Sequence, residues 1–206
     1  MTSRMRRHLA CMATAAALLA FAAWSVPAVA HPHVWITDVT TFVFEQRQLV
    51  ALRHRWAFDE LFGSFVIEQH DADGDGRFDA AETEGLRADA FDNLEEYNYF
   101  THLRIDGSTL PLHEVRDFRA SIDDGELVYE FTLALPEPVD PAAADLALGV
   151  YDPEYYVELL LDEDDPVRFA GLPSGACIFE LGEDTEHPIY CGMVYPVMIK
   201  LACATS

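Results

Sequence analysis

The stretch Leu127-Val-Tyr-Glu-Phe-Thr-Leu-Ala-Leu135 alternates large apolar side chains with smaller or polar ones. Successive side chains of a β-strand point to opposite faces of a sheet, so this period of two predicts a half-buried strand. Asp124-Gly125, a dipeptide typical of hairpin turns, lies just before it. The stretch therefore predicts a sheet with one apolar face.

More strands and one helical region are expected on either side of this stretch. Segments rich in Val, Ile, Thr, Phe and Leu predict strands over 34–45, 49–58, 146–150, 156–161 and 193–202. Apolar residues recur at helical spacing over 59–70 and 80–100, and Asp59 is placed to cap the first of these helices. This order predicts an α+β fold: a single strand-rich, β-sandwich-like domain with a helix–EF-hand loop–helix insert.

The loop between the two expected helices, residues 71–82, fits the EF-hand calcium loop position by position. Such a loop supplies oxygen ligands from positions 1, 3, 5, 7, 9 and 12. These positions hold Asp71, Asp73, Asp75, Arg77, Asp79 and Glu82, and Arg77 would contribute its backbone carbonyl. Gly76 stands at position 6, where the backbone must turn with positive φ. Because calcium is a hard cation that prefers oxygen ligands, the loop predicts a Ca²⁺ site.

A lone loop of this kind indicates a structural role for calcium. Extracellular calcium modules bind at ~10⁻⁴–10⁻³ M, so an exported site stays filled and does not act as a sensor. The alternative is an acidic turn between two helices that holds no ion. The match at every ligand position and at the glycine favours calcium.

Residues 1–30 have the features of a cleaved secretory signal peptide. Three arginines form a positive start, an apolar run follows over 9–24, and Ala28-Val-Ala30 fits the pattern that signal peptidase cleaves. The apolar run is short for a membrane span. We therefore expect residues 31–206 to form a single periplasmic domain that does not span the membrane.

Cleavage after Ala30 would place His31-Pro-His33 at the new N-terminus. The α-amine and the rings of His31 and His33 offer three nitrogens, a donor set that suits copper, nickel or zinc. Pro32 lacks an N–H and so cannot supply an amide-nitrogen ligand. His31 and His33 are thus candidate ligands of a transition metal, and the other ligands stay undetermined. The alternative is a polar strand start that binds no metal.

Export also makes a disulfide possible. The expected mature chain keeps Cys177, Cys191 and Cys203, an odd number that leaves at least one thiol unpaired. We predict a Cys177–Cys191 disulfide, because the short loop between these residues closes easily. Cys203 lies close to the end of the chain, where fraying is expected.

The charge of the chain excludes one class of partner. There are 36 acidic and 13 basic residues, for a formal net charge of -23. Such a protein repels phosphate backbones, which excludes nucleic acid as a main ligand. A Ser–His–Asp arrangement, a glycine-rich phosphate loop and a zinc-protease helix motif are all missing from the sequence, which disfavours familiar hydrolases.

Six motifs follow one another along the chain: His31-Pro-His33-Val-Trp35, Trp56-x-Phe58-Asp59-Glu60, Asp73-Gly-Asp75-Gly76, Glu96-Tyr-Asn-Tyr-Phe100, Asp152-Pro-Glu-Tyr-Tyr156 and Gly175-Ala-Cys177. Together they resemble an exported bacterial family of unknown function, loosely labelled the periplasmic component of an uncharacterised ABC-type transport system. The resemblance covers nearly all of the mature chain. It implies an association with metal permeases of the nickel/cobalt or zinc type.

These observations predict a non-enzymatic periplasmic metal-binding protein that is accessory to transition-metal transport. Its cofactors would be structural Ca²⁺ and a transition metal (nickel, cobalt, zinc or copper), and its partner an inner-membrane metal permease. Two alternatives stay open. A copper-dependent redox enzyme would use the N-terminal histidine for catalysis, whereas a calcium-stabilised interaction module would bind no transition metal.

Overall fold

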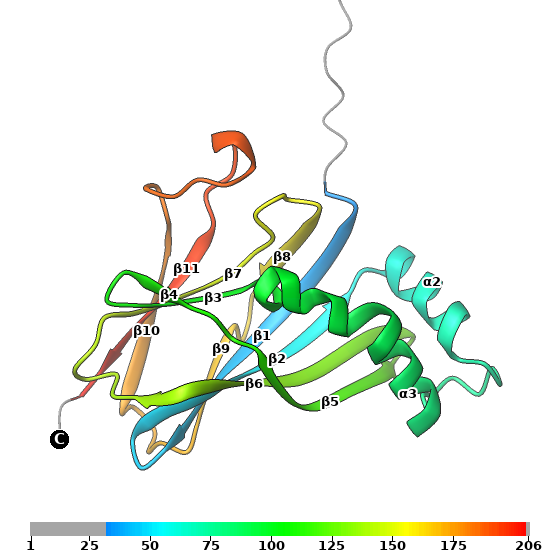
Figure 1. Cartoon of the computed structure of the whole chain (residues 1–206), viewed down its shortest axis with the longest axis horizontal. Helices are drawn as coiled ribbons and strands as arrows, with labels where there is room; N and C mark the ends of the chain where they lie inside the picture. Colours follow the sequence, from blue (N-terminus) through cyan, green and yellow to red (C-terminus); the bar gives the residue numbers. More distant parts are fainter. Residues whose placement is uncertain (1–31, 205–206) are drawn as a thin grey trace, which may run out of the picture. The chain divides into compact units, whose positions relative to one another are not determined.

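The computed structural model describes residues 32–204 of the chain (Figure 1). Both the expected signal peptide at 1–30 and the candidate ligand His31 lie outside the described residues. Within 32–204 the strands form two sheets, and helical structure is confined to residues 60–100 and a short turn at 190–192. The strand-rich α+β class expected from the sequence is confirmed. None of the described helices is long and apolar enough to cross a membrane.

The larger sheet has six strands and contains residues 127–135, whose alternation predicts a half-buried strand. Its order is β5 (Glu114–Asp123), β6 (Glu126–Val139), β2 (Gln48–Phe58), β1 (Val34–Glu45) and β8 (Val157–Leu161), with β9 (Val167–Ala170) also paired to β1. The first four strands are antiparallel, whereas β8 and β9 run parallel to β1. Asp124 and Gly125, both at positive φ, form the turn between β5 and β6 as predicted.

The smaller sheet is antiparallel throughout and has five strands. Its order is β10 (Cys177–Glu183), β11 (Val197–Cys203), β7 (Leu146–Val150), β3 (Thr101–Ile105) and β4 (Ser108–Leu110). Apolar residues of both sheets belong to one buried cluster. The two sheets therefore share a single hydrophobic core.

Strand β6 is more deeply buried than its alternating pattern predicts. Leu127, Tyr129 and Phe131 are buried as expected, but Val128 and Thr132 of the opposite set are buried as well. The position of β6 explains this, because it lies between β5 and β2 and is not at an edge of the sheet. Neighbouring strands on both sides shield its small side chains from water.

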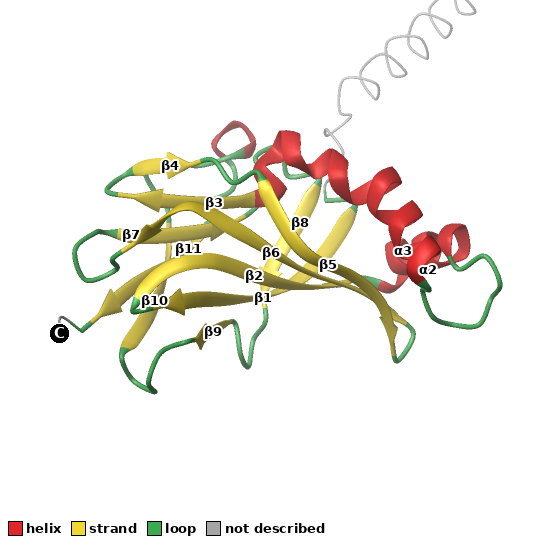
Figure 2. Ribbon diagram, turned by 60° about the horizontal axis from the view of Figure 1, so that its bottom comes forward, coloured by secondary structure: helices red, strands yellow, loops and turns green. Residues whose placement is uncertain are grey.

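The helical region begins with α2 (Glu60–His70), and Asp59 caps it as predicted by accepting the Phe62 N–H at 3.0 Å. Gly63 lets this helix approach β6, since an added Cβ would lie 3.3 Å from Cβ of Leu127. After a loop, α3 (Ala80–Leu86) continues into η1 (Arg87–Phe91) and η2 (Asp92–Phe100). These segments run beside β5 and β6 (Figure 2).

The structure corrects the predicted disulfide. Cys177 is bonded to Cys203 instead of Cys191, which is an exposed free thiol in the short helical turn η3 (Tyr190–Gly192). The reason is the register of β10 and β11, which sets Cys177 directly opposite Cys203 with their Cα atoms 4.1 Å apart. Cys203 is held in a paired strand and is not frayed, although it lies close to the end of the chain.

Replacing Cys203 by Ser should lower the free energy of unfolding. The bond closes a loop of 26 residues, and a loop of this length is worth about 3.5 kcal/mol through the entropy of the unfolded chain. Urea unfolding of the oxidised protein measures the loss. The matched variant Cys191→Ser should change stability by no more than about 0.5 kcal/mol. A larger loss in Cys191→Ser than in Cys203→Ser would contradict this pairing.

Candidate functional site

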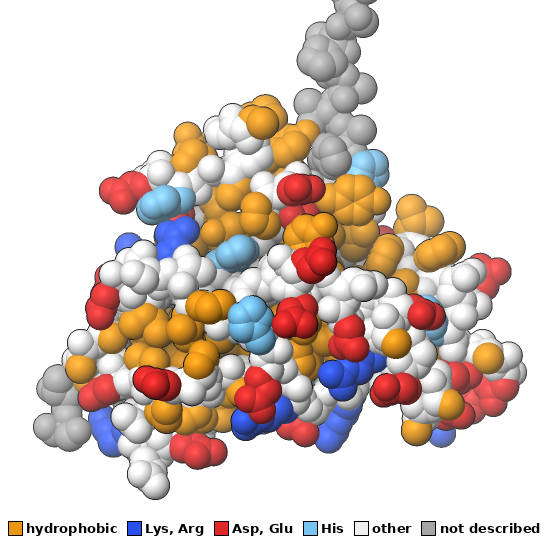
Figure 3. All heavy atoms as spheres, viewed as in Figure 1, with side chains coloured by type: hydrophobic (Ala, Val, Ile, Leu, Met, Phe, Trp, Pro, Cys, Tyr) orange, Lys and Arg blue, Asp and Glu red, His pale blue; other side chains and the backbone are white. Residues whose placement is uncertain are grey.

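The acidic loop predicted from the sequence joins α2 to α3, and acidic side chains gather at that end of the helices (Figure 3). Carboxylate oxygens of Asp71, Asp73 and Glu82 all lie within 4.8 Å of one another. These are positions 1, 3 and 12 of the predicted calcium loop. Residues 11 positions apart in sequence thus bring their negative charges together.

Backbone amides orient all three of these carboxylates, and Asp73 accepts the N–H of Asp75 at 3.1 Å. Asp71 accepts the N–H groups of residues 74–76 at 3.0, 3.2 and 3.0 Å. Glu82 accepts the N–H of Ala72 at 2.7 Å through one oxygen and the N–H of Asp79 at 2.9 Å through the other. The Glu82 side chain therefore holds the two ends of the loop together.

The other three predicted calcium ligands lie outside this cluster. Asp75, Arg77 and Asp79 do not belong to the carboxylate cluster. The Asp79 carboxylate caps α3 by accepting the N–H groups of Ala81 and Glu82 at 2.7 and 2.9 Å. Gly76 has φ = +79°, the positive value that its loop position predicts. The loop has the predicted turn, and three of its six predicted ligand residues form the cluster.

The candidate ligand His33 lies immediately before β1 and is exposed. Its N–H donates to the Tyr156 carbonyl at 2.9 Å, and the two rings lie 4.8 Å apart between centroids. Among the described residues, no group of three His, Cys, Asp or Glu ligand atoms includes His33. Any metal site at His33 therefore needs ligands from outside 32–204 or from another molecule.

A second polar cluster, which the sequence analysis did not find, lies inside the core. Asp38 of β1 and His54 of β2 are both 0% exposed, and Nδ1 of His54 lies 2.9 Å from Oδ1 of Asp38. Because a carboxylate only accepts, His54 donates through Nδ1. Thr40 donates its hydroxyl to the other carboxylate oxygen at 2.6 Å. The hydroxyl of Thr101, from β3 in the smaller sheet, lies 3.3 Å from Nε2 of His54.

A carboxylate, an imidazole and a hydroxyl in this order also make up catalytic triads. Here all three groups are buried, and the cluster has a structural role instead. Thr101 is also 0% exposed and donates its hydroxyl to the Tyr99 carbonyl at 2.9 Å. A nucleophile must reach a substrate, and all three groups are closed off from solvent. The cluster instead links the two sheets. Strand alternation could have signalled it, since Asp38 and His54 stand at inward-facing positions.

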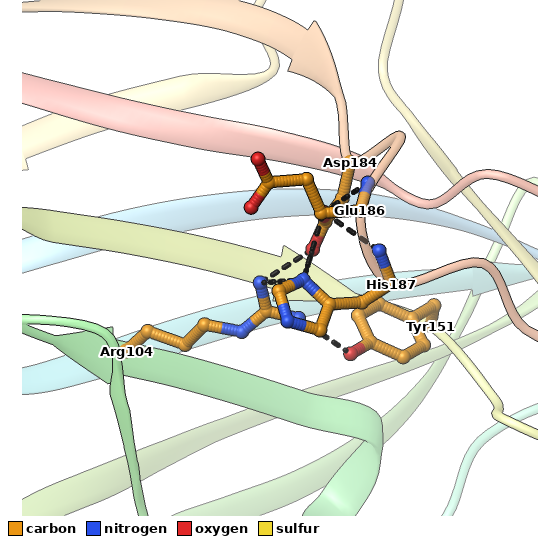
Figure 4. Close-up of polar contacts among 5 residues, drawn as sticks. All are labelled: Arg104, Tyr151, Asp184, Glu186 and His187. Carbon is orange, nitrogen blue, oxygen red and sulfur yellow. Dashed lines mark hydrogen bonds and ion pairs between the residues drawn. The ribbon is translucent and has the colours of Figure 1, made fainter.

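A third cluster joins the loop after β10 to the smaller sheet (Figure 4). Arg104 of β3 donates to the Asp184 carboxylate and to Oη of Tyr151, the latter at 3.4 Å. Nδ1 of His187 lies 3.0 Å from the Asp184 carboxylate. Burial alone raises the pKa of Asp184, but the hydrogen bonds from Arg104 and His187 outweigh it and lower this pKa to about 2. The Arg104 charge is thus already paired, and the cluster holds the loop in place.

Comparison with known proteins identifies the family. Residues 16–190 match a family described as "Protein of unknown function (DUF1007)", and the chain belongs to this family. An uncharacterised 15.5 kDa protein from the trpE 3′ region of Spirochaeta aurantia is 33% identical over 131 residues, which are 64% of this chain and 93% of that protein. An uncharacterised protein of Haemophilus influenzae is 29% identical over 149 residues, 69% of this chain and 68% of its own length. The resemblance to a family of unknown function is confirmed, and neither relative carries a described activity.

Replacing Asp38 by Asn should destabilise the fold. The change replaces a buried carboxylate that accepts hydrogen bonds from His54 and Thr40, and a buried hydrogen bond to a charged group is worth about 1.5–3 kcal/mol. Thr101→Val should cost less, about 1 kcal/mol, since it removes a neutral hydroxyl. Chemical denaturation measures both. The control Asp124→Asn, in the exposed β5–β6 turn, should stay near the wild-type stability. Equal stability of Asp38→Asn and this control would contradict the structural role of the pair.

Proposed function

We propose that this protein is an exported, non-enzymatic metal-binding protein that serves transition-metal transport. A calcium ion in the loop at 71–82 would stabilise the helical insert. A transition metal (nickel, cobalt, zinc or copper) would bind at the mature N-terminus through His31 and His33. The observation that carries the proposal is the cluster of Asp71, Asp73 and Glu82.

The spacing of the three carboxylates supports calcium. Ca–O distances are about 2.3–2.6 Å, so oxygens on opposite sides of one ion lie at most about 5 Å apart. The cluster oxygens fall within 4.8 Å of one another and meet this limit. All the donors are hard oxygens, which Ca²⁺ prefers over the nitrogen and sulfur ligands typical of transition metals.

The backbone of the loop supports the same ion. Asp71 and Glu82 are already oriented by main-chain N–H groups. Asp73 is exposed, also accepts a main-chain N–H, and brings a third negative charge close to them. A divalent cation would relieve this repulsion, whereas an acidic turn without an ion keeps it. The carbonyl of Arg77 and the carboxylates of Asp75 and Asp79 would complete the oxygen shell.

Calcium should raise the melting temperature of the protein. A ligand at 100 times its Kd adds about 2.7 kcal/mol to the folded state, and each kcal/mol is worth about 2–4 °C for a domain of this size. We therefore expect calcium to raise the melting temperature by about 5–10 °C. Glu82→Gln keeps the side-chain shape but removes the charge, and should abolish most of this shift.

The matched control for this experiment is Glu84→Gln, an exposed glutamate of α3 outside the carboxylate cluster. It should keep the wild-type response to calcium. Identical melting of the apo and calcium-loaded wild-type protein would contradict the calcium site. An equal loss of response in Glu84→Gln would mean that general negative charge, not the loop, binds the ion.

The position of His33 supports a second metal site. Its backbone is tied to Tyr156 by a hydrogen bond and its side chain is exposed at the start of β1. His31 is only two residues away along the chain, so its ring and a new α-amine could join the His33 imidazole on one ion. A site with few fixed ligands would leave coordination positions open, which suits a protein that passes its metal to a permease.

The buried cluster supports a binding role over catalysis. Asp38, His54 and Thr101 are the residues that most resemble a catalytic set, and none of them is accessible to a substrate. The permease is proposed from the resemblance to a transport-associated family, and the net charge of -23 would favour the approach of cations.

Replacing His33 by Ala should remove the transition metal without removing calcium. Protein exported and processed by its host would be examined by intact mass and by elemental analysis of the same sample. The wild type should begin at His31 and hold near-stoichiometric nickel, cobalt, copper or zinc besides calcium. His113→Ala, at another exposed histidine, should keep both metals. A different first residue, or calcium alone in the wild type, would contradict the N-terminal site.

A further inference from the structure

A groove of about 670 Å³ lies between β8 of the larger sheet and the segment 189–197, which leads into β11 of the smaller sheet. All five residues of β8 line this groove. Successive side chains of a strand point to opposite faces of a sheet, so a groove that touches five residues in a row follows the edge of the strand. The N–H of Tyr190 donates to the Pro153 carbonyl at 3.3 Å and holds the opposite wall in place.

Strand β8 has a neighbouring strand on one side only (Figure 1). It pairs in parallel with β1, and no other described strand pairs with it. Alternate residues of a strand direct their N–H and C=O groups to opposite edges. The N–H of Asp162 donates to the Asp38 carbonyl, and the Tyr156 carbonyl accepts the His33 N–H. The even-numbered residues therefore face β1, and the odd-numbered residues of β8 face the open edge.

Most of the main-chain groups at this edge have no partner. The N–H of Val157 is bonded to the Asp152 carboxylate at 3.0 Å. Outside β1, no described residue bonds to the N–H or C=O groups of Leu159 and Leu161. Unpaired groups on every second residue are the feature with which an added strand pairs.

The side chains of β8 do little to prevent such pairing. Native edge strands are commonly protected by charged residues or proline. The sequence of β8 is Val-Glu-Leu-Leu-Leu, and Glu158 is its single charged residue. The Glu158 carboxylate already accepts Nε1–H of Trp35 at 2.9 Å and the hydroxyl of Tyr155 at 3.1 Å. The edge is therefore both unpaired and apolar.

Large apolar side chains are exposed on both walls of the groove. Leu160 on the β8 side and Leu181, Tyr195 and Val197 on the opposite side are each 45–48% exposed. A contiguous apolar patch with a polar rim is typical of a protein interaction site. An extended segment that pairs with β8 could bury its own apolar side chains against both walls.

The charges of the groove indicate what kind of segment fits. Every charged residue that lines it is acidic, and the exposed Glu163 and Asp164 lie just beyond the end of β8. Arg168, the nearest cation along the chain, pairs with Asp165 instead, at 2.7 Å. A basic segment would therefore be attracted to this end of the groove. A second copy of the chain would bring the same carboxylates and be repelled.

We propose that this groove binds an extended, basic and apolar segment of a partner protein, which adds to the open edge of β8 as a further strand. The main chain of the segment would pair with Leu159 and Leu161. Its apolar side chains would pack against the two walls, and its basic side chains would meet Glu163 and Asp164. Five paired residues would span about 16 Å, the length of β8.

Labelled peptides test this proposal by fluorescence anisotropy on the exported and processed protein. The probe KRVTVTVKR has an alternating centre and basic ends, and the matched probe EDVTVTVED has acidic ends. The basic probe should bind about tenfold more tightly, because it adds charge pairs where the acidic probe adds repulsion. Equal affinities, or no binding of either probe at its solubility limit, would overturn the proposal.

N-methylation of the basic probe distinguishes strand addition from charge attraction alone. Methyl groups on alternate residues remove the N–H donors along one edge of the peptide and leave the other edge intact. One of the two alternate sets should weaken binding about tenfold or more, since it removes the bonds to β8, and the other set should have little effect. Equal effects of the two sets would overturn strand addition.

The variant Leu160→Lys places a charge on the exposed face of β8, as protected edge strands do. It should weaken the basic probe about tenfold, whereas Leu61→Lys, at an exposed leucine of α2 outside the groove, should bind it as the wild type does. Wild-type affinity in Leu160→Lys would contradict the site. A wild-type dimer that becomes a monomer in Leu160→Lys would assign the edge to a second copy and overturn the proposed partner.

Two double variants test the acidic end of the groove. Glu163→Gln with Asp164→Asn should weaken the basic probe severalfold. Glu126→Gln with Glu137→Gln makes the same change of charge on β6, outside the groove, and should leave the affinity unchanged. Equal weakening in both would mean that the overall charge attracts the probe, and would overturn the site. None of these variants alters a proposed metal ligand, so failure here is distinguishable from failure of the metal sites.

Discussion

A buried acid–histidine pair, Asp38 with His54, is the interaction on which the arrangement of the two sheets depends. Removing these groups from water is costly unless each has a partner, and Thr40 and Thr101 complete the cluster. Thr101 belongs to the smaller sheet, so the cluster requires both sheets to be in place. A slip of one residue in β1 or β2 would turn Asp38 or His54 to the opposite face and leave the other unpaired.

The same two strands position both proposed metal sites. His33 immediately precedes β1, and β2 ends just before Asp59, from which the chain enters α2 and then the acidic loop. The Asp59 carboxylate links the start of β1 to the start of α2. One of its oxygens accepts the Trp35 N–H, and the other caps α2 by accepting the Phe62 N–H. The register that the buried pair sets in the core therefore also fixes where the histidine and the loop lie.

A cavity of about 320 Å³ lined mainly by aromatic and aliphatic residues, among them Trp56 and Phe100, is a further consequence of this packing. His54 and Trp56 are two residues apart on β2 and point to the same face, so the polar cluster and the cavity are neighbours. The far wall belongs to η1 and η2, which continue directly from α3. Since α3 begins at the acidic loop, an ion that orders the loop would also stabilise the helical wall of the cavity.

Much of the fold was determined by the sequence itself, because the responsible signals are local. Alternation over 127–135, the Asp59 cap, the Asp124-Gly125 turn and the loop spacing at 71–82 each involve residues that are close in sequence. Only the tertiary structure decided the Cys177–Cys203 bond, the Asp38–His54–Thr101 cluster and the pairing of Trp56 with Tyr129. These contacts join residues far apart in the chain. They depend on which strands become neighbours and in which register, and that is set by burial of the common core and not by any one segment.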